Sequence, residues 1–191
     1  MTSMFARLTR FLSHSLALIL FASIAHAATP AATNDPVAAL RAVMASRLAL
    51  MPAVAAYKWN HHLPVEDMTR ESDLLDKMIA TAEKNGFDHD YAITMISAQI
   101  EAGKAIQDRL IDGWRFNQAG TLENERDLKA DLRPKITKLT EKFLMAVKAA
   151  RPALASCKAQ EELRDPPDGL EDDIMAWRIA ADGIIDSTPC R

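Results

Sequence analysis

The sequence predicts an all-α protein, a single-domain bundle of about six helices, and two observations support this fold class. The chain of 191 residues contains only 6 glycines beside abundant Ala, Leu, Met, Lys and Glu, a composition that favours helices over strands. Apolar residues recur with a period near 3.6 in several segments, whereas alternation with period two is absent over any useful length. The length corresponds to one domain, and helical bundles build their sites from side chains on facing helices.

The N-terminal segment has the features of a secretory signal peptide. Arg7 and Arg10 supply a positive start, residues 16–24 form a short apolar run, and an A-x-A cleavage motif ends at Ala27. A membrane anchor is the alternative, but the apolar run is about half of the ~20 residues that a spanning helix needs. We therefore expect residues 1–27 to be removed by cleavage after Ala27, which leaves a periplasmic or secreted protein with no membrane contact.

The domain is expected to cover residues 36–191, after a flexible leader of small and polar residues at 28–35. Its first helix should begin at Pro36, because a capping aspartate precedes it and proline is favoured at the first helical position. The apolar pattern reaches Trp59. Within it, Pro52 should kink the helix or remove one hydrogen bond without having to end it.

Five further helices are indicated by apolar residues at helical spacing, with glycine and proline at the breaks. Asn85-Gly86 ends the first of them, Pro152 separates two others, and Pro134 is a candidate break inside one. The predicted ranges are 67–84, 88–116, 125–150, 153–164 and 170–186.

Two cysteines, Cys157 and Cys190, follow the predicted cleavage point. In an oxidising compartment a disulfide is their natural pairing, with two free thiols as the alternative. The closed loop of about 33 residues would stabilise the fold by roughly 3–4 kcal/mol in the chain-entropy model.

Composition and motifs exclude several classes of function. The formal net charge of −3 lacks the basic excess of a nucleic-acid-binding protein. The sequence has no nucleotide-binding glycine motif, no serine-hydrolase motif, and no set of His, Cys and carboxylate residues at metal-ligand spacing. We therefore expect no nucleic-acid partner, no metal and no cofactor.

Arg47 and Lys58 are the first residues that require a chemical explanation. They are eleven residues apart, which returns them to within about 20° of the same helix face, about 16 Å apart along the axis. The face between them carries Met51, Val54 and Ala55, so both cations lie on an apolar stripe. Because a buried cation without a partner costs several kcal/mol, each needs a carboxylate from another helix or an anionic ligand. The spacing leaves both possibilities open.

A second polar group lies at the start of the helix at 67–84. Asp67, Arg70 and Glu71 stand at i, i+3 and i+4, so they share one face of its first turn. A helix cap with a surface ion pair has the same pattern as a binding site, and such pairs contribute little to stability.

A polar stripe at i, i+4 and i+8 follows the helix at 88–116 and consists of Gln99, Gly103 and Gln107. Because glycine within a helix costs about 1 kcal/mol relative to alanine, Gly103 indicates close approach of another helix or a ligand. An ordinary packing glycine is the alternative. Arg133, beside a candidate helix break, carries little information alone.

These residues together carry a resemblance to a known family. Over residues 36–187 the sequence resembles the AroQ-type all-helical chorismate mutases. The pattern that carries the resemblance is, in order, Arg47-x10-Lys58-Trp59, Leu63-Pro64-Val65-Glu66-Asp67-x2-Arg70-Glu71 and Gln99-Ile100-x6-Gln107. The signal peptide, the additional C-terminal helices and the cysteine pair are similar to the secreted gamma subclass of that family.

The resemblance implies an activity and a set of residue roles. The reaction is the rearrangement of chorismate to prephenate, an intramolecular isomerisation that uses no metal and no cofactor. Arg47 would pair with one substrate carboxylate, and Arg133 would reach the other anionic end from a later helix. Lys58 and Gln107 would donate hydrogen bonds to the ether oxygen of the breaking C–O bond.

The remaining implied contacts involve the hydroxyl and a carboxylate of the substrate. Asp67 and Glu71 would hold the substrate hydroxyl, with Arg70 orienting them or touching a carboxylate. The family usually has Ser or Thr where this sequence has Gly103, so a hydroxyl contact to a carboxylate is lost. A backbone N–H, a water molecule or Lys104 could replace that contact.

Two further expectations concern assembly and the rival function. The secreted relatives imply a homodimer whose sites each lie inside one chain. A non-catalytic periplasmic binding or adaptor protein of helical fold is the alternative function, in which the cations would form internal salt bridges or bind another anion.

Overall fold

The computed structural model describes residues 35–185 and Cys190. All described residues belong to one compact unit. The predicted signal peptide, its cleavage site and the leader up to residue 34 lie outside the described residues.

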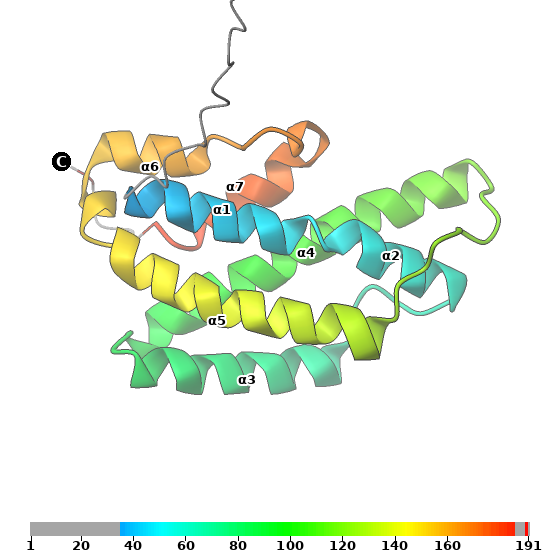
Figure 1. Ribbon diagram of the computed structural model, residues 1–191, viewed down its shortest axis with the longest axis horizontal. Helices are drawn as coiled ribbons and strands as arrows, with labels where there is room; N and C mark the ends of the chain where they lie inside the picture. Colours follow the sequence, from blue (N-terminus) through cyan, green and yellow to red (C-terminus); the bar gives the residue numbers. More distant parts are fainter. Residues whose placement is uncertain (1–34, 186–189, 191) are drawn as a thin grey trace, which may run out of the picture. The chain divides into compact units, whose positions relative to one another are not determined.

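The prediction of an all-α fold is confirmed, since the described residues form helices and no strand. This part of the chain contains seven α-helices, and from α4 onward a short π- or 3-10-helical turn precedes each further α-helix (Figure 1). They are α1 (Pro36–Leu48), α2 (Met51–Asn60), α3 (Met68–Lys84), α4 (His89–Phe116), η1 (Leu128–Leu132), α5 (Arg133–Ala150), η2 (Ala153–Ala155), α6 (Cys157–Arg164), η3 (Glu171–Asp173) and α7 (Ile174–Asp182).

The first predicted helix is two helices in the structure, and Pro52 is the reason. Proline has no N–H to donate to the carbonyl oxygen one turn earlier, that of Leu48, which is where α1 ends. The backbone tightens instead, and the Leu50 N–H donates to the Arg47 oxygen at 3.2 Å. Figure 1 shows α2 continuing in nearly the direction of α1, so the two helices still present one lengthwise face.

The stretch Pro36–Asn60 is long and apolar enough to cross a membrane by length and composition. Three of its large apolar side chains, those of Leu40, Met44 and Leu48, are fully buried within the protein. The helical core therefore accounts for the apolar character of this stretch.

Helices α3 and α4 follow the predicted ranges closely because their starts carry caps. The Asp67 and Asp88 side chains accept backbone N–H groups at the starts of α3 and α4. The predicted helix at 153–164 is instead divided at Ser156 into η2 and α6, and the one at 170–186 begins as η3 and ends as α7 at Asp182, with no side-chain cap at the start of α6 or α7. The predicted helix at 125–150 begins as the π-helix η1, in which the Arg133 N–H reaches back to the Leu128 oxygen, and continues as α5. Pro134, which lacks an N–H, marks this change of helix type.

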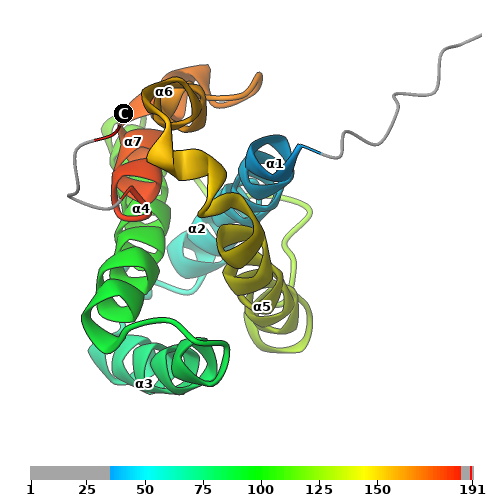
Figure 2. The same ribbon diagram turned by 90° about the vertical axis from the view of Figure 1, so that its left-hand side faces the viewer.

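The long helix α4 organises the packing. It packs against α2, α3 and α7, while α5 packs against α1 (Figure 2). The predicted disulfide is confirmed, since Cys157 at the start of α6 bonds Cys190 with an S–S distance of 2.11 Å. The buried Trp177 indole donates to the Leu163 oxygen at 2.9 Å and joins α7 to α6. Of the C-terminal helices, α7 thus packs directly on α4, while α6 packs on α7 and α1.

Candidate active site

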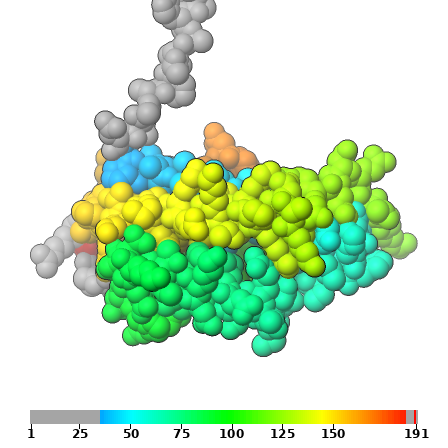
Figure 3. Space-filling model, turned by 60° about the horizontal axis from the view of Figure 1, so that its bottom comes forward, coloured from blue at the N-terminus to red at the C-terminus, as the bar shows by residue number. Residues whose placement is uncertain are grey.

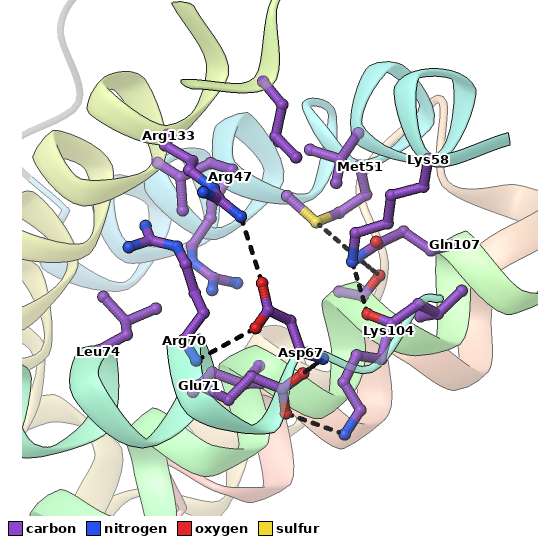
Figure 4. Close-up of a pocket in the computed structure, with 16 residues that line it drawn as sticks. Arg47, Met51, Lys58, Asp67, Arg70, Glu71, Leu74, Lys104, Gln107 and Arg133 are labelled. Carbon is purple, nitrogen blue, oxygen red and sulfur yellow. Dashed lines mark hydrogen bonds and ion pairs between the residues drawn. The ribbon is translucent and has the colours of Figure 1, made fainter. Parts of the chain in front are cut away.

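One pocket, with a volume of about 100 Å³, collects side chains from helices far apart in the sequence. It lies between α1 and α2, the first turns of α3 and α5, and the middle of α4 (Figure 4); Figure 3 shows the surface where α5 lies beside α3. All eight residues that the sequence predicted as substrate contacts line it: Arg47, Lys58, Asp67, Arg70, Glu71, Gly103, Gln107 and Arg133. The structure therefore brings the predicted set together.

Arg47, in the last turn of α1, is a buried cation with only 4% of its surface exposed. Its Nη1 donates to the Gln99 carbonyl oxygen at 2.6 Å, and its Nε has no hydrogen-bond partner among the described residues. Burial lowers the pKa of Arg47 to about 10, and no described carboxylate lies near enough to oppose that shift. Its positive charge is therefore desolvated and unpaired.

Lys58, in the last turn of α2, is 9% exposed and faces the same pocket. Its Nζ donates to the Val65 carbonyl oxygen at 2.5 Å. Burial lowers the pKa of Lys58, and the nearby Glu71 and Asp67 carboxylates oppose that shift without forming a direct ion pair among the described residues. Of the two partners that the sequence left open for Arg47 and Lys58, the structure favours an anionic ligand.

Asp67 and Glu71 cap α3 and line the pocket at the same time. An Asp67 carboxylate oxygen accepts the Arg70 N–H at 3.2 Å, and a Glu71 oxygen accepts the Asp67 N–H at 2.9 Å. The second Asp67 oxygen accepts from Arg133 at 3.3 Å, and the second Glu71 oxygen accepts from Lys104 at 3.2 Å. The helix-cap interpretation is confirmed, and the same two carboxylates also line the pocket.

Arg70 and Arg133 bring two guanidinium groups to the pocket lining from α3 and α5. Burial lowers the pKa of Arg70, and the positive charge of Arg133 lowers it further. An anion between them would relieve this repulsion. Figure 4 shows both side chains on the same side of the pocket as Arg47.

Gln107 and Gly103 form the α4 side of the pocket. The buried Gln107 Nε2 donates to the Gly103 carbonyl oxygen at 2.9 Å and lies 3.7 Å from the Met51 sulfur. Its Oε1 is buried without a partner among the described residues. Gln99, predicted to extend the same stripe, instead donates to the Ala180 oxygen at 3.0 Å and lies outside the pocket lining.

Lys104 lines the pocket but is held by carboxylates. Its Nζ lies 2.9 Å from Glu101, 3.2 Å from Glu71 and 3.4 Å from Glu66. Although partial burial acts in the opposite direction, hydrogen bonds with Glu101 and Glu71 raise the pKa of Lys104. These pairings make Lys104 a poor replacement for the hydroxyl that is missing at Gly103.

The sequence did not identify the pocket's apolar wall as part of a site. Met51 and Val54 were assigned to a helix stripe, and Val65 and Ile100 stood within the family pattern, with no role assigned to either. The apolar lining residues are Met51, Val54, Val65, Leu74, Ile100, Leu128 and Ile136.

Fold and pocket together define a class of protein. It is a helical bundle with a partly apolar pocket lined by three guanidinium groups, two ammonium groups, two carboxylates and an amide. Because one of the ammonium groups, that of Lys104, is paired with carboxylates, the remaining cations suit a small multiply charged anion. The described residues hold no cluster of His, Cys, Asp and Glu that could bind a metal ion.

Comparison with known proteins identifies the family: the chain belongs to the chorismate mutase type II family. The family's sequence pattern matches residues 38–108, which include every predicted substrate contact except Arg133. A secreted chorismate mutase from Mycobacterium tuberculosis is 32% identical over 147 residues, which are 74% of this chain and 73% of that protein.

Other relatives agree over shorter stretches. A monofunctional chorismate mutase from Enterobacter agglomerans is 33% identical over 108 residues, 56% of this chain, and a secreted chorismate mutase from Yersinia pestis is 32% identical over 115 residues, 59% of this chain. The matches span 59% and 62% of those two relatives. The chorismate mutase structure from Burkholderia thailandensis has a TM-score of 0.70 at 26% identity and covers 79% of this chain and 99% of that one.

Proposed function

We propose that this protein is a chorismate mutase, which converts chorismate to prephenate by a concerted [3,3] rearrangement. The observation that carries the proposal is the buried Arg47 without a carboxylate partner, placed in one pocket with Lys58, Arg70 and Arg133. The reaction needs no nucleophile, base or cofactor. It needs a flexible dianion held in its reactive shape and donors aimed at the charge that develops on the ether oxygen.

The cations divide these tasks between them. Arg47 and Arg133 approach from α1 and α5 and are assigned to the two carboxylates, since a guanidinium is planar and charged at neutral pH. Lys58 and Gln107 lie together on the other side of the pocket and donate to the ether oxygen (Figure 4). Both side chains line the pocket and are held by neighbouring groups, which supports donation with little reorganisation at the moment of reaction.

The carboxylates of α3 are assigned to the substrate hydroxyl. Asp67 and Glu71 each use one oxygen for the helix start, and their second oxygens lie toward Arg133 and Lys104. Each carboxylate is therefore held in orientation from two directions. Arg70 completes the pocket lining and touches a carboxylate or orients its neighbours.

We also infer export and self-association. The signal-peptide features of residues 1–27 and the secreted relatives support a periplasmic or secreted protein that is cleaved after Ala27. A homodimer is proposed by analogy with the secreted subclass. N-terminal sequencing of the exported protein and light scattering in solution test the two points; a start other than Ala28 or a monomer mass would contradict them.

The activity is tested by the loss of chorismate absorbance and the appearance of prephenate with the purified protein. The Lys58→Ala variant should lose about 10²–10³-fold in kcat with an intact circular dichroism spectrum, because it removes an ether-oxygen donor. Lys142→Ala, an exposed lysine of α5 away from the pocket, is the matched control and should keep wild-type kcat. A folded wild-type protein that leaves chorismate unchanged would favour the adaptor function instead.

A further inference from the structure

Gly103 leaves room in the pocket that Met51 fills. A Cβ atom added at Gly103 would lie 2.9 Å from the Met51 sulfur, 3.6 Å from its Cγ and 4.0 Å from the nearest Arg47 nitrogen. A contact of 2.9 Å is too short for carbon and sulfur, so no side chain fits at position 103 while Met51 keeps its place. The two residues are therefore sterically matched across the α2–α4 interface.

The same two residues hold the carboxamide of Gln107. Its Nε2 donates to the Gly103 carbonyl oxygen at 2.9 Å, which fixes the orientation of the amide, since a flip would set Oε1 against that carbonyl oxygen. Nε2 also lies 3.7 Å from the Met51 sulfur, within reach of its second N–H. A thioether sulfur is only a weak acceptor, so this second contact is easily exchanged for a better one.

We infer that Met51 and Gly103 form a matched pair that positions Gln107, with Met51 as a positioning residue and not a catalytic one. The sulfur keeps the second N–H of Gln107 directed into the pocket, and the ether oxygen of the substrate takes over that N–H in the transition state. This inference rests on the proposed chorismate mutase activity. It also explains why this chain tolerates glycine where its family usually has a hydroxyl: the space of that side chain is taken by Met51.

If Met51 and Gly103 are sterically matched, the effect on kcat of a substitution at position 103 should depend on the residue at position 51. Gly103→Ser alone forces the Met51 sulfur to move and should lower kcat by about tenfold or more, because small displacements of a catalytic donor are costly. In a Met51→Ala background the serine has room, and the same substitution should change kcat by less than about twofold. KM should change less than kcat, because the ether-oxygen contact strengthens in the transition state.

Gly113→Ser is the matched control. Gly113 lies on the same helix, and a Cβ atom there meets nothing within 4 Å, so this variant should keep wild-type kcat and KM.

A second double-mutant cycle, between positions 51 and 107, tests whether Met51 acts through Gln107. Met51→Ala should lower kcat in the wild-type background and have no further effect in a Gln107→Ala background.

The experiment measures kcat, KM and circular dichroism for the single and double variants. Three outcomes would each overturn the inference while leaving the activity established. Gly103→Ser could have the same effect in both backgrounds, or it could keep wild-type kcat. Alternatively, the effects of Met51→Ala and Gln107→Ala could be additive. A wild-type protein without activity would instead overturn the proposed function, and the positioning role with it.

Discussion

Arg47 illustrates, for a single residue, why this pocket favours an anion. Its guanidinium is buried, satisfies only the Gln99 carbonyl oxygen, and has no described carboxylate as a counter-charge. The folding of the chain has already removed most water from this cation, at a cost in stability. A dicarboxylate that enters the pocket supplies the missing charge to a group that is desolvated and oriented in advance.

Activity should be flat from mildly acidic to neutral pH and should fall on the alkaline side. Gln107 donates without titrating, so kcat should be constant between about pH 5 and 7.5. Burial lowers the pKa of Lys58 below its ordinary 10.5, against the opposing carboxylates Glu71 and Asp67, and lowers that of Arg47 to about 10. Both cations lose charge at a lower pH than exposed ones, so kcat/KM should decline as pH approaches about 10.

A pH profile of kcat and kcat/KM checks this prediction, and a steep loss of kcat between about pH 5 and 7.5 would rule out Gln107 as the neutral donor.

The lowered pKa values of Lys58 and Arg47 affect stability in the opposite direction to activity. Because both cations have lower pKa values folded than unfolded, the unfolded state binds more protons and their burial penalty is present at neutral pH. That penalty is relieved only as pH rises through the folded pKa values, so these two groups do not cause an alkaline loss of fold.

The first turn of α3 combines a helix cap and the proposed contact to the substrate hydroxyl in one carboxylate. Asp67 caps the helix with one oxygen and pairs with Arg133 through the other. Asp67→Asn should keep the cap and leave the free energy of unfolding nearly unchanged, whereas Asp67→Ala should lower it by about 1 kcal/mol. Both variants should raise KM or lower kcat, because both weaken the carboxylate that is assigned to the substrate hydroxyl.

Urea unfolding combined with steady-state kinetics separates the two roles. Equal stability of the two variants would argue against the cap, and wild-type kinetics in Asp67→Asn would argue against the binding role.

Helix ends and faces could be predicted from the sequence where the cause is local. Asp67 and Asp88 cap their own helices, and the spacing of Arg47 and Lys58 places them on one face even though the backbone breaks between them. The sequence predicted a kink at Pro52, whereas the structure has a complete break between α1 and α2. Pro52 lacks the N–H that would continue the helix, and no side-chain hydrogen bond caps the start of α2.

Site residues that depend on tertiary packing could not be derived in this way. Arg133 enters the pocket only because α5 packs beside α3, and its role was implied by the family resemblance alone. Met51 has the spacing of an ordinary core residue, and its relation to Gly103 and Gln107 exists only once α2 and α4 are in contact.

At the scale of the whole molecule, the disulfide and the pocket are separate features. Cys157 and Cys190 close a loop that includes α6 and α7, and neither helix contributes a residue to the pocket lining. Reduction should therefore lower the free energy of unfolding by roughly 3–4 kcal/mol while kcat stays near wild type under folding conditions.

The Cys157→Ser/Cys190→Ser double variant is the control for incomplete reduction, and denaturant unfolding with parallel kinetics is the measurement. A large loss of kcat in a folded reduced protein would show that the C-terminal helices shape the pocket through α4, on which α7 packs.

We expect helices distant in sequence to hold one dianion between Arg47 and Arg133, with its ether oxygen on Lys58 and Gln107. A crystal structure with a bound dicarboxylate transition-state analogue tests this expectation most directly. We predict one carboxylate on Arg47, the other on Arg133, and the ether oxygen within hydrogen-bond distance of Lys58 Nζ and Gln107 Nε2, with the Met51 sulfur no longer the partner of that N–H. An analogue bound outside this pocket, or bound in it with its ether oxygen away from both donors, would contradict the account.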